Sequence, residues 1–477
     1  MPHHDVSSEE ILKKAGYRQD LARSLTVLQT VGLALSDITP AASFFVIAAQ
    51  IFPMTGTGAG WTFLLAGIIA LSVAFSMAEL GSRYPFAGGL YAIVTRVLGK
   101  PIGFLAMVDY VVQAIFLPAS IALGIGGYIQ TLVPGINANI WATILMALVT
   151  ILAVLRVKTN ANITGIFLSV ELAVMVLVTI VGLVHPLTPF SLLIHPVSFN
   201  ASHVSPVKAA VILAAISVAL FSYNGYDSAI NFSEETDGSA RNVGKSVMNA
   251  ASLGVLFQVV PAFAVILADG TIRAFYGASL PIEYYVEHAI GPTGATIVIL
   301  GVILAVINAT LAIVLQFSRV IYSTGRDQSW PAPVNRALTL IHSRYRTPWV
   351  SVLVVGVLGI GLTLLGSAVA AITFTSVMII ILYALVAISA IVHRVGRLKT
   401  GELPFKMWIW PVPPLVALAG VILAISQQTS GDLETCAAIF GGGFLYYLVW
   451  ARRQPGLWHV STSLVEEPAK SSARPVK

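Results

Sequence analysis

LSDITPAAS (Leu35–Ser43) interrupts one long apolar run of this sequence, and FSYNGYD (Phe221–Asp227) interrupts another. Each interruption lies in the first hydrophobic span of what reads as a unit of five spans. A break at bilayer depth frees backbone donors and acceptors, and only a buried cavity or a bound ligand can satisfy them. Paired breaks at corresponding positions of two halves are the best sequence indication of a secondary transporter's binding site.

The composition is that of a membrane protein. Hydrophobic residues make up 57% of the chain and charged residues 10%, whereas soluble domains carry roughly 25% charged residues. A run of about 20 apolar residues crosses the hydrocarbon core of a bilayer. We therefore expect about twelve spans, at residues 25–51, 61–82, 101–131, 139–155, 162–184, 207–233, 246–268, 294–325, 349–366, 369–392, 408–427 and 433–451.

The basic residues mark one side of the membrane. All of the 27 Lys and Arg residues except Lys208 and Arg273 fall in the two terminal segments and in alternate loops. Because cytoplasmic loops carry the excess of Lys and Arg, both termini are predicted to be cytoplasmic in a plasma (inner) membrane. The net charge of +6 thus reflects topology, and we expect no nucleic-acid partner.

Several intracellular stretches carry recognisable patterns. They are AELGSRYPFAGGLY (78–91), FSYNGYDSAINFSEET (221–236) with SARNVGKSV (239–247), SRVIYSTGRD (318–327) and RTP (346–348). Together, in this order and spacing, they resemble the amino acid–polyamine–organocation (APC) permeases over roughly residues 20–450. The pattern is most similar to bacterial putrescine, amine and amino acid importers.

The resemblance implies an all-α integral membrane protein with the LeuT-type fold, in which two inverted repeats of five helices are followed by two additional helices. It divides the chain into a cytoplasmic N-terminal segment (1–24), a transport core (25–392) and two further helices (408–451), before a cytoplasmic tail (452–477). Within the core, the repeats would cover about 25–184 and 207–392.

The first break departs from the family pattern. Many amino acid permeases of this family have a glycine-rich break whose free N–H groups cradle the substrate carboxylate. This chain has SDITP (36–40) there. Pro40 lacks an N–H, and Asp37 would repel a carboxylate. The usual amino acid recognition is therefore in question, although backbone donors around Ala41 and Ala42 remain.

Four acids lie within predicted spans and have no basic partner there: Asp37, Asp109, Glu171 and Asp227. An unpaired carboxylate in hydrocarbon takes up a proton or holds a cation, so each is a candidate functional group. Glu171 is the predicted proton carrier, with structural pairing as the alternative. Asp37 is predicted to bind a substrate amine or a proton. Asp227 is expected to fix the second break, and Asp109 is a gate or structural acid that can also lie at the interface.

The breaks supply the remaining candidates for a substrate-binding site: Ser36, Asp37, Thr39, Ala41, Phe221, Tyr223, Asn224 and Tyr226. The aromatic rings can face a cation, and simple helix packing is the alternative. Asn308 and Thr310 keep sodium coupling open, although the unpaired Glu171 favours protons. No other cofactor and no metal site is expected.

Charged residues after the second break suggest an inner gate. Glu234 and Glu235 can pair with Arg241 or with basic residues of neighbouring loops. The alternative is a solvated cluster of little energetic consequence.

The sequence therefore predicts a proton-coupled permease that imports amino acids or related amines, including polyamines, by alternating access. An obligatory exchanger of the same family is the main alternative, and a membrane sensor or enzyme is a remote one. An enzyme is not expected because the chain contains no HExxH, GxSxG or phosphate-loop motif. The substrate identity and the oligomeric state stay open.

Overall fold

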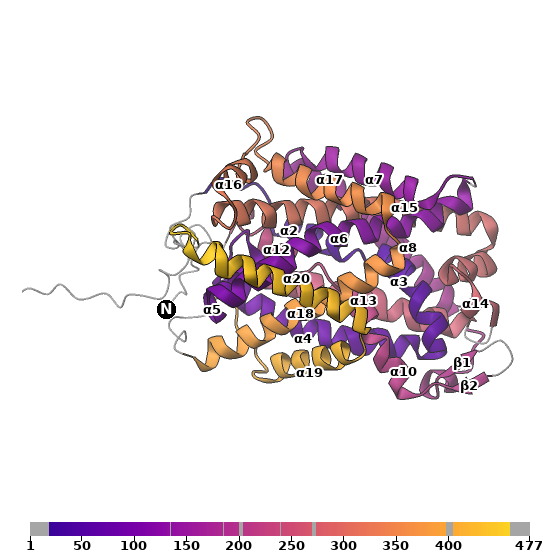
Figure 1. Cartoon of the computed structure of the whole chain (residues 1–477). Helices are drawn as coiled ribbons and strands as arrows, with labels where there is room; N and C mark the ends of the chain where they lie inside the picture. Colours follow the sequence, from indigo (N-terminus) through magenta and orange to yellow (C-terminus); the bar gives the residue numbers. More distant parts are fainter. Residues whose placement is uncertain are drawn as a thin grey trace, which may run out of the picture.

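The computed structural model describes residues 19–133, 135–184, 186–199, 204–238, 240–269, 273–396 and 404–457. Figure 1 shows an elongated bundle in which most helices run side by side along one direction. Within these ranges, the strands are β1 (Val197–Phe199) and β2 (Val204–Pro206), which pair as an antiparallel hairpin.

The first half of the chain contains the helices α2 (Val27–Ile38), α3 (Pro40–Thr55), α4 (Ala59–Arg83), α5 (Gly89–Leu98), α6 (Lys100–Leu132), α7 (Ala138–Ala153) and α8 (Val157–Val184), with a 3-10 turn at Gly56–Gly58. The first of them is started by a capping box. The Thr26 hydroxyl accepts from the backbone of Gln29, and the Gln29 side chain accepts from the backbone of Thr26.

The second half contains α9 (Ser191–Ile194), α10 (Ala209–Ala214), α11 (Ile216–Phe221), α12 (Ser228–Asn231), α13 (Ala240–Asp269), α14 (Arg273–Gly277), α15 (Pro281–Arg326), α16 (Ala332–Leu338), α17 (Trp349–Leu365), α18 (Ala368–Val395), α19 (Val412–Ser426) and α20 (Ser430–Val449). Helix α15 kinks at Gly291, where φ is 77°. A 3-10 turn at Ala451–Arg453 follows α20.

Seven helical segments of the described chain are long and apolar enough to cross a membrane. They are Val27–Arg83, Lys100–Gln130, Val157–Val184, Ala240–Ala268, Pro281–Arg326, Ala368–Val395 and Ser430–Arg453. Shorter apolar helices occupy other predicted spans, among them α7, α17 and α19. The first segment contains both of the first two predicted spans, because α2, α3 and α4 follow one another almost without a connection.

The loops separate into two groups at the two ends of the bundle. At one end, the Thr347 hydroxyl donates to the Val154 carbonyl at 2.7 Å. At the other end, the backbone N–H of Leu187 donates to the Leu267 carbonyl at 2.9 Å. In Figure 1 the elements α5 and α16 lie at the left end, and α14, β1 and β2 lie at the right end. Loops predicted to share a side of the membrane therefore meet in space.

Several helices at equivalent positions of the two predicted repeats pack against each other. Helix α4 packs on α13, α6 on α15, and α7 on α17. Helices α19 and α20 pack on the outside of this core, α19 against α4 and α18, and α20 against α6. Large apolar side chains stay exposed on the outer helices, as at Ile151 and Leu365. An outer surface of this kind suits lipid rather than water.

Candidate functional site

The first break lies between α2 and α3 and is one residue long. Thr39 adopts the left-handed conformation with φ of 46°, and Pro40 begins α3. Proline suits a first helical position because the missing N–H has no partner there. The carbonyl of Ile38, freed by the break, accepts from the Ser43 hydroxyl at 2.9 Å.

The second break replaces the middle of the sixth predicted span with turns between Phe221 and Ser228. The freed Ser222 carbonyl accepts from the Gln258 side chain of α13 at 2.6 Å. Gly225 has φ of 128°, a conformation that other residues rarely adopt.

The two breaks contact each other, as their paired positions predicted. A Cβ on Gly225 would lie 2.5 Å from the Ile38 nitrogen and 2.6 Å from the Asp37 carbonyl carbon. Only glycine allows the two backbones to approach this closely. The contact brings the acids of the two breaks, Asp37 and Asp227, close enough to interact electrostatically.

The side chain of Glu171, on α8, accepts hydrogen bonds from residues at the first break. Its Oε1 accepts from the Thr39 hydroxyl at 2.9 Å and from the Ala41 backbone N–H at 2.9 Å. Its Oε2 accepts from the Asn308 amide of α15 at 3.3 Å. The side chain is fully buried. One carboxylate thus joins α8, the start of α3 and α15.

Several oxygens at the breaks are buried without a hydrogen-bond partner. Both carboxylate oxygens of Asp37 and the hydroxyls of Ser36 and Ser228 belong to this group. The Ser228 hydroxyl faces Asp37 but does not make a hydrogen bond of good geometry. The two breaks therefore contain several buried oxygens that have no hydrogen-bond partner.

Asp227 is held by two side chains that the sequence did not single out. Its Oδ2 accepts from the Tyr110 hydroxyl of α6 and, at 2.9 Å, from the Gln316 amide of α15. The Asn231 amide donates to the same tyrosine oxygen at 3.0 Å. The expectation that Asp227 accepts from a tyrosine agrees with this geometry. The sequence signal that could have identified Gln316 is its amide side chain within an otherwise apolar span.

The aromatic residues of the second break pack against helices rather than facing an open site. The Tyr223 hydroxyl donates to the Phe63 carbonyl at 2.8 Å, and the Tyr226 hydroxyl donates to the Ala70 carbonyl at 3.1 Å, both on α4. Phe221 is buried in the main core. Helix packing accounts for these side chains in this conformation, and the hypothesis that their rings face a cation stays a prediction.

Asn224 keeps a polar role through a different neighbour. Its Oδ1 accepts from the Tyr383 hydroxyl of α18 at 3.0 Å. The ring of Tyr383 in turn stacks on Tyr226, with centroids 6.1 Å apart. The side chain of Tyr383 thereby links α18 to the second break.

Asp109 of α6 has its hydrogen-bond partner outside the two breaks, and its placement at the membrane interface stays a prediction. The residue is fully buried, and its Oδ1 accepts from Gln113 one turn away at 2.7 Å. Helix α6, which carries Asp109, packs against α18 and α20. In the part of the chain that the structure describes, no hydrogen bond or ion pair joins Asp109 to either break, and its role as a gate stays a prediction.

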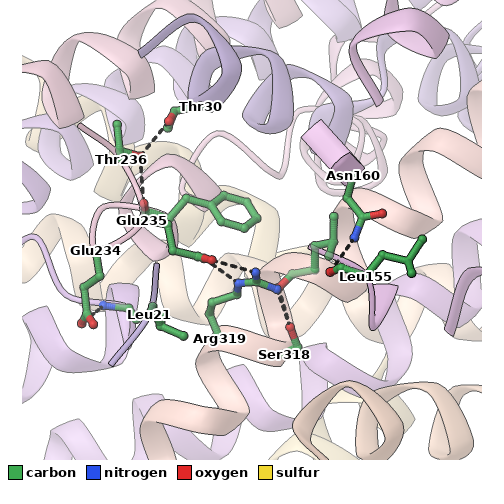
Figure 2. A network of polar contacts seen from close by, with 12 residues as sticks. Leu21, Thr30, Leu155, Asn160, Glu234, Glu235, Thr236, Ser318 and Arg319 are labelled. Atoms are coloured by element: carbon green, nitrogen blue, oxygen red, sulfur yellow. Dashed lines mark hydrogen bonds and ion pairs between the residues drawn. The ribbon is translucent and has the colours of Figure 1, made fainter. Parts of the chain in front are cut away.

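Glu234 and Glu235, the predicted gate acids, form ion pairs with arginines of α15. Arg319 donates through Nε to Glu235 Oε2 at 2.8 Å and through Nη2 to Oε1 at 3.0 Å, and both side chains are fully buried. Figure 2 shows the Arg319 guanidinium between the Glu235 carboxylate and the Ser318 hydroxyl. Glu234 pairs with Arg326 at 2.9 Å.

Arg241 is not the partner of these glutamates. Its side chain is exposed, and no ion pair joins it to Glu234 or Glu235 in the part of the chain described here. The sequence analysis offered Arg241 or basic residues of neighbouring loops, and the partners are Arg319 and Arg326, near the C-terminal end of α15. The alternative of a solvated charge cluster is wrong, because the side chains of Glu234, Glu235 and Arg319 are buried.

The chain before α2 is tied to this ion-pair region. The backbone N–H groups of Ser24 and Leu25 donate to the Glu235 carbonyl at 2.9 Å, and Asp237 N–H donates to Leu25 O at 2.8 Å. The hydroxyls of Thr30 and Thr236 lie 2.7 Å apart (Figure 2). The start of the first span and the end of the second break therefore form one connected unit.

The sequence analysis did not predict a further buried ion pair at the same end of the bundle. Arg394 of α18 pairs with Glu79 of α4, and the Met407 N–H donates to the same carboxylate at 2.8 Å. The motif that contains Glu79 was recognised, but its partner lies more than three hundred residues away. Among the described residues, no group of three or more His, Cys, Asp or Glu side chains is arranged to hold a metal ion.

The chain matches a family model described as "Amino acid permease" over residues 25–435. It is 22% identical over 471 residues to a methylthioribose transporter of Bacillus subtilis, covering 93% of this chain and 96% of the relative. It is 24% identical over 368 residues to a branched-chain amino acid permease of the same species, covering 71% and 74%. It is 25% identical over 350 residues to a low-affinity putrescine importer of Escherichia coli, covering 72% and 75%.

The family match extends from the span that contains the first break into α20, so it includes both breaks and the buried ion pairs. The relatives are transporters, and none is named as an enzyme. The chain belongs to the amino acid permease family of the APC superfamily, and it is an integral membrane transporter.

Proposed function

We propose that this permease is a secondary-active importer of amino acids or related amines, driven by protons and working by alternating access in the plasma membrane. The names of its relatives cover branched-chain amino acids, putrescine and methylthioribose, which supports a small organic substrate. Both termini would be cytoplasmic, since the loops that carry the basic residues share one end of the bundle.

The proposed architecture is a LeuT-type fold with inverted repeats at about 25–184 and 207–392, followed by two additional helices at 408–451. The packing of α4 on α13, α6 on α15 and α7 on α17 supports it. An axis that relates two repeats brings equivalent helices together, and the contact between the two breaks follows the same rule.

The observation that carries the proposal is the position of Glu171. Its carboxylate is buried and accepts hydrogen bonds from the neutral groups of Thr39, Ala41 and Asn308. Ionised Glu171 accepts all of these bonds, whereas protonation turns one oxygen into a donor and removes an acceptor. Proton binding therefore changes the contact between α8 and the start of α3, beside the substrate site.

The inner gate would consist of the Glu235–Arg319 and Glu234–Arg326 pairs. They connect the segment after the second break to α15, and the chain before α2 is bound to the same segment. Opening the site to the cytoplasm would require these contacts to separate. In the described conformation, Ser36, Asp37 and Asp227 are at most 3% exposed, as an occluded state requires.

The test is uptake into proteoliposomes with an inward proton gradient and no internal substrate. Wild-type protein should accumulate substrate, and Glu171→Gln should lose this uptake while retaining exchange of internal for external substrate. Asp109→Asn is the matched control, because it removes a second buried carboxylate away from the breaks. Its coupling should be unchanged.

Three results would contradict the proposal. Loss of both uptake and exchange in well-folded Glu171→Gln protein would remove the coupling role. Wild-type uptake that follows a sodium gradient instead would mean that sodium, not the proton, is the coupling ion. Asn308 would then be the first residue to test. Movement only against internal substrate would make the protein an obligatory exchanger.

A further inference from the structure

The N-terminus of α3 is an anion site that the protein fills with its own carboxylate. Helix α3 has 16 residues and begins at the first break. The start of such a helix attracts anions through free N–H groups and the helix dipole. Pro40 has no N–H, and the N–H of Ala41 donates to Glu171 at 2.9 Å. The Thr39 hydroxyl donates to the same oxygen.

A substrate carboxylate would therefore meet a site that is already occupied. To reach the Ala41 N–H it would have to displace Glu171, and two carboxylates on one donor repel each other at close range. Glu171 is further held by Asn308 from α15. An amino acid thus loses the anchor that its carboxylate needs in this part of the site.

Beside that filled site lies a group of oxygens that lacks donors. Both oxygens of Asp37, Oδ1 of Asp227 and the hydroxyls of Ser36 and Ser228 have no hydrogen-bond partner. Asp37 is 3% exposed and Asp227 is 2% exposed. The backbone contact at Gly225 holds the two breaks together.

The described neighbours do not supply a positive charge to this group. Asp227 accepts from Tyr110 and Gln316, which are neutral, and none of the ion pairs between described residues includes Asp37 or Asp227. Burying carboxylate oxygens without donors is costly. A protonated amine brings three N–H donors and no acceptor. Such donors are what these buried oxygens lack.

We propose that the site selects small organic ammonium ions without a carboxylate, and that Glu171 excludes amino acids by occupying the α3 N-terminus. The ammonium group would lie against Asp37, with Asp227, Ser36 and Ser228 around it. This inference rests on the proposed transport function and narrows its substrate class. Asp37 and Glu171 then act as the specificity-determining residues.

The experiment compares pairs of compounds that differ only in the carboxylate. Full-length protein in proteoliposomes is tested with cadaverine against lysine and with isopentylamine against leucine, by equilibrium binding and by uptake. Each amine should bind at least about tenfold more tightly than its amino acid, a difference of about 1.4 kcal/mol. Equal or tighter binding of lysine and leucine overturns the inference but leaves the transport function intact. Uptake of none of the four compounds overturns the proposed function and this inference with it.

Single variants test the contributions of Asp37 and Glu171 separately. Glu171→Ala frees the Ala41 N–H, so leucine binding should improve at least about tenfold relative to wild type. Asp37→Asn should weaken isopentylamine by a similar factor and leave leucine unchanged. Asp109→Asn is the control and should keep the wild-type ratio. An unchanged leucine affinity in Glu171→Ala overturns the exclusion. If that variant does not fold, equal losses of amine and amino acid in Asp37→Asn overturn the selection of charge.

Discussion

The pair between Glu235 and Arg319 offers a quantitative test of what holds the proposed inner gate together. The perturbation is Glu235→Ala, which removes the carboxylate and leaves the Arg319 charge fully buried. The guanidinium would keep only its bonds to the Leu315 carbonyl, at 3.1 Å, and to the Ser318 hydroxyl, at 3.0 Å. It would also keep its place 5.4 Å from the Phe232 ring.

The expected cost follows from burial. Both side chains have no exposed surface, and two hydrogen bonds between charged groups disappear in Glu235→Ala. Removing one member of a buried pair costs about 3–5 kcal/mol, because the remaining charge stays in a low-dielectric surrounding. Arg319→Met should cost a similar amount, since it leaves the Glu235 carboxylate unpaired.

The assay is the free energy of unfolding in mixed micelles for both single variants and for the double variant Glu235→Ala/Arg319→Met. The double variant removes both charges of this pair, so its loss should be at least about 1 kcal/mol smaller than the sum of the single losses. Arg241→Gln is the matched control. Its side chain is exposed in the neighbouring helix α13, and the change should stay within about 0.5 kcal/mol.

Additive losses in the double variant would refute the reasoning, because they would mean that the two charges do not depend on each other. A single-variant loss below about 1 kcal/mol would refute it as well, since a pair of that strength is typical of exposed ion pairs.

Two substitutions at the second break test the packing described above. Gly225→Ala should abolish uptake even where the protein folds, because a Cβ would lie 2.5 Å from the Ile38 nitrogen and φ is 128°; normal uptake would show that the breaks do not approach this closely. Tyr223→Phe should cost about 1 kcal/mol of stability through its bond to the Phe63 carbonyl, with KM unchanged in the uptake assay. A large rise in KM for an amine would instead place the Tyr223 ring on the substrate.

The sequence by itself determined the class of the protein and the location of its breaks. Spans are set by the thickness of the bilayer, and the polar, proline and glycine residues of 35–43 and 221–227 marked the two breaks within them. The motifs on the intracellular loops identified the APC superfamily, which the family match confirms. The distribution of Lys and Arg predicted which loops share an end, and the loop contacts agree with it.

Only the tertiary structure decided which side chains meet. Spacing left open whether Glu235 pairs with Arg241 or with a basic residue of a neighbouring loop, and the packing of α15 supplied Arg319. Glu171 was recognised as a buried acid, but its bond to the Ala41 N–H was not. The physical reason is that every span is buried or faces lipid, so the apolar pattern does not declare which face of a helix points inward. Partners separated by more than a hundred residues are chosen by the way helices cross, and that choice is invisible in local sequence.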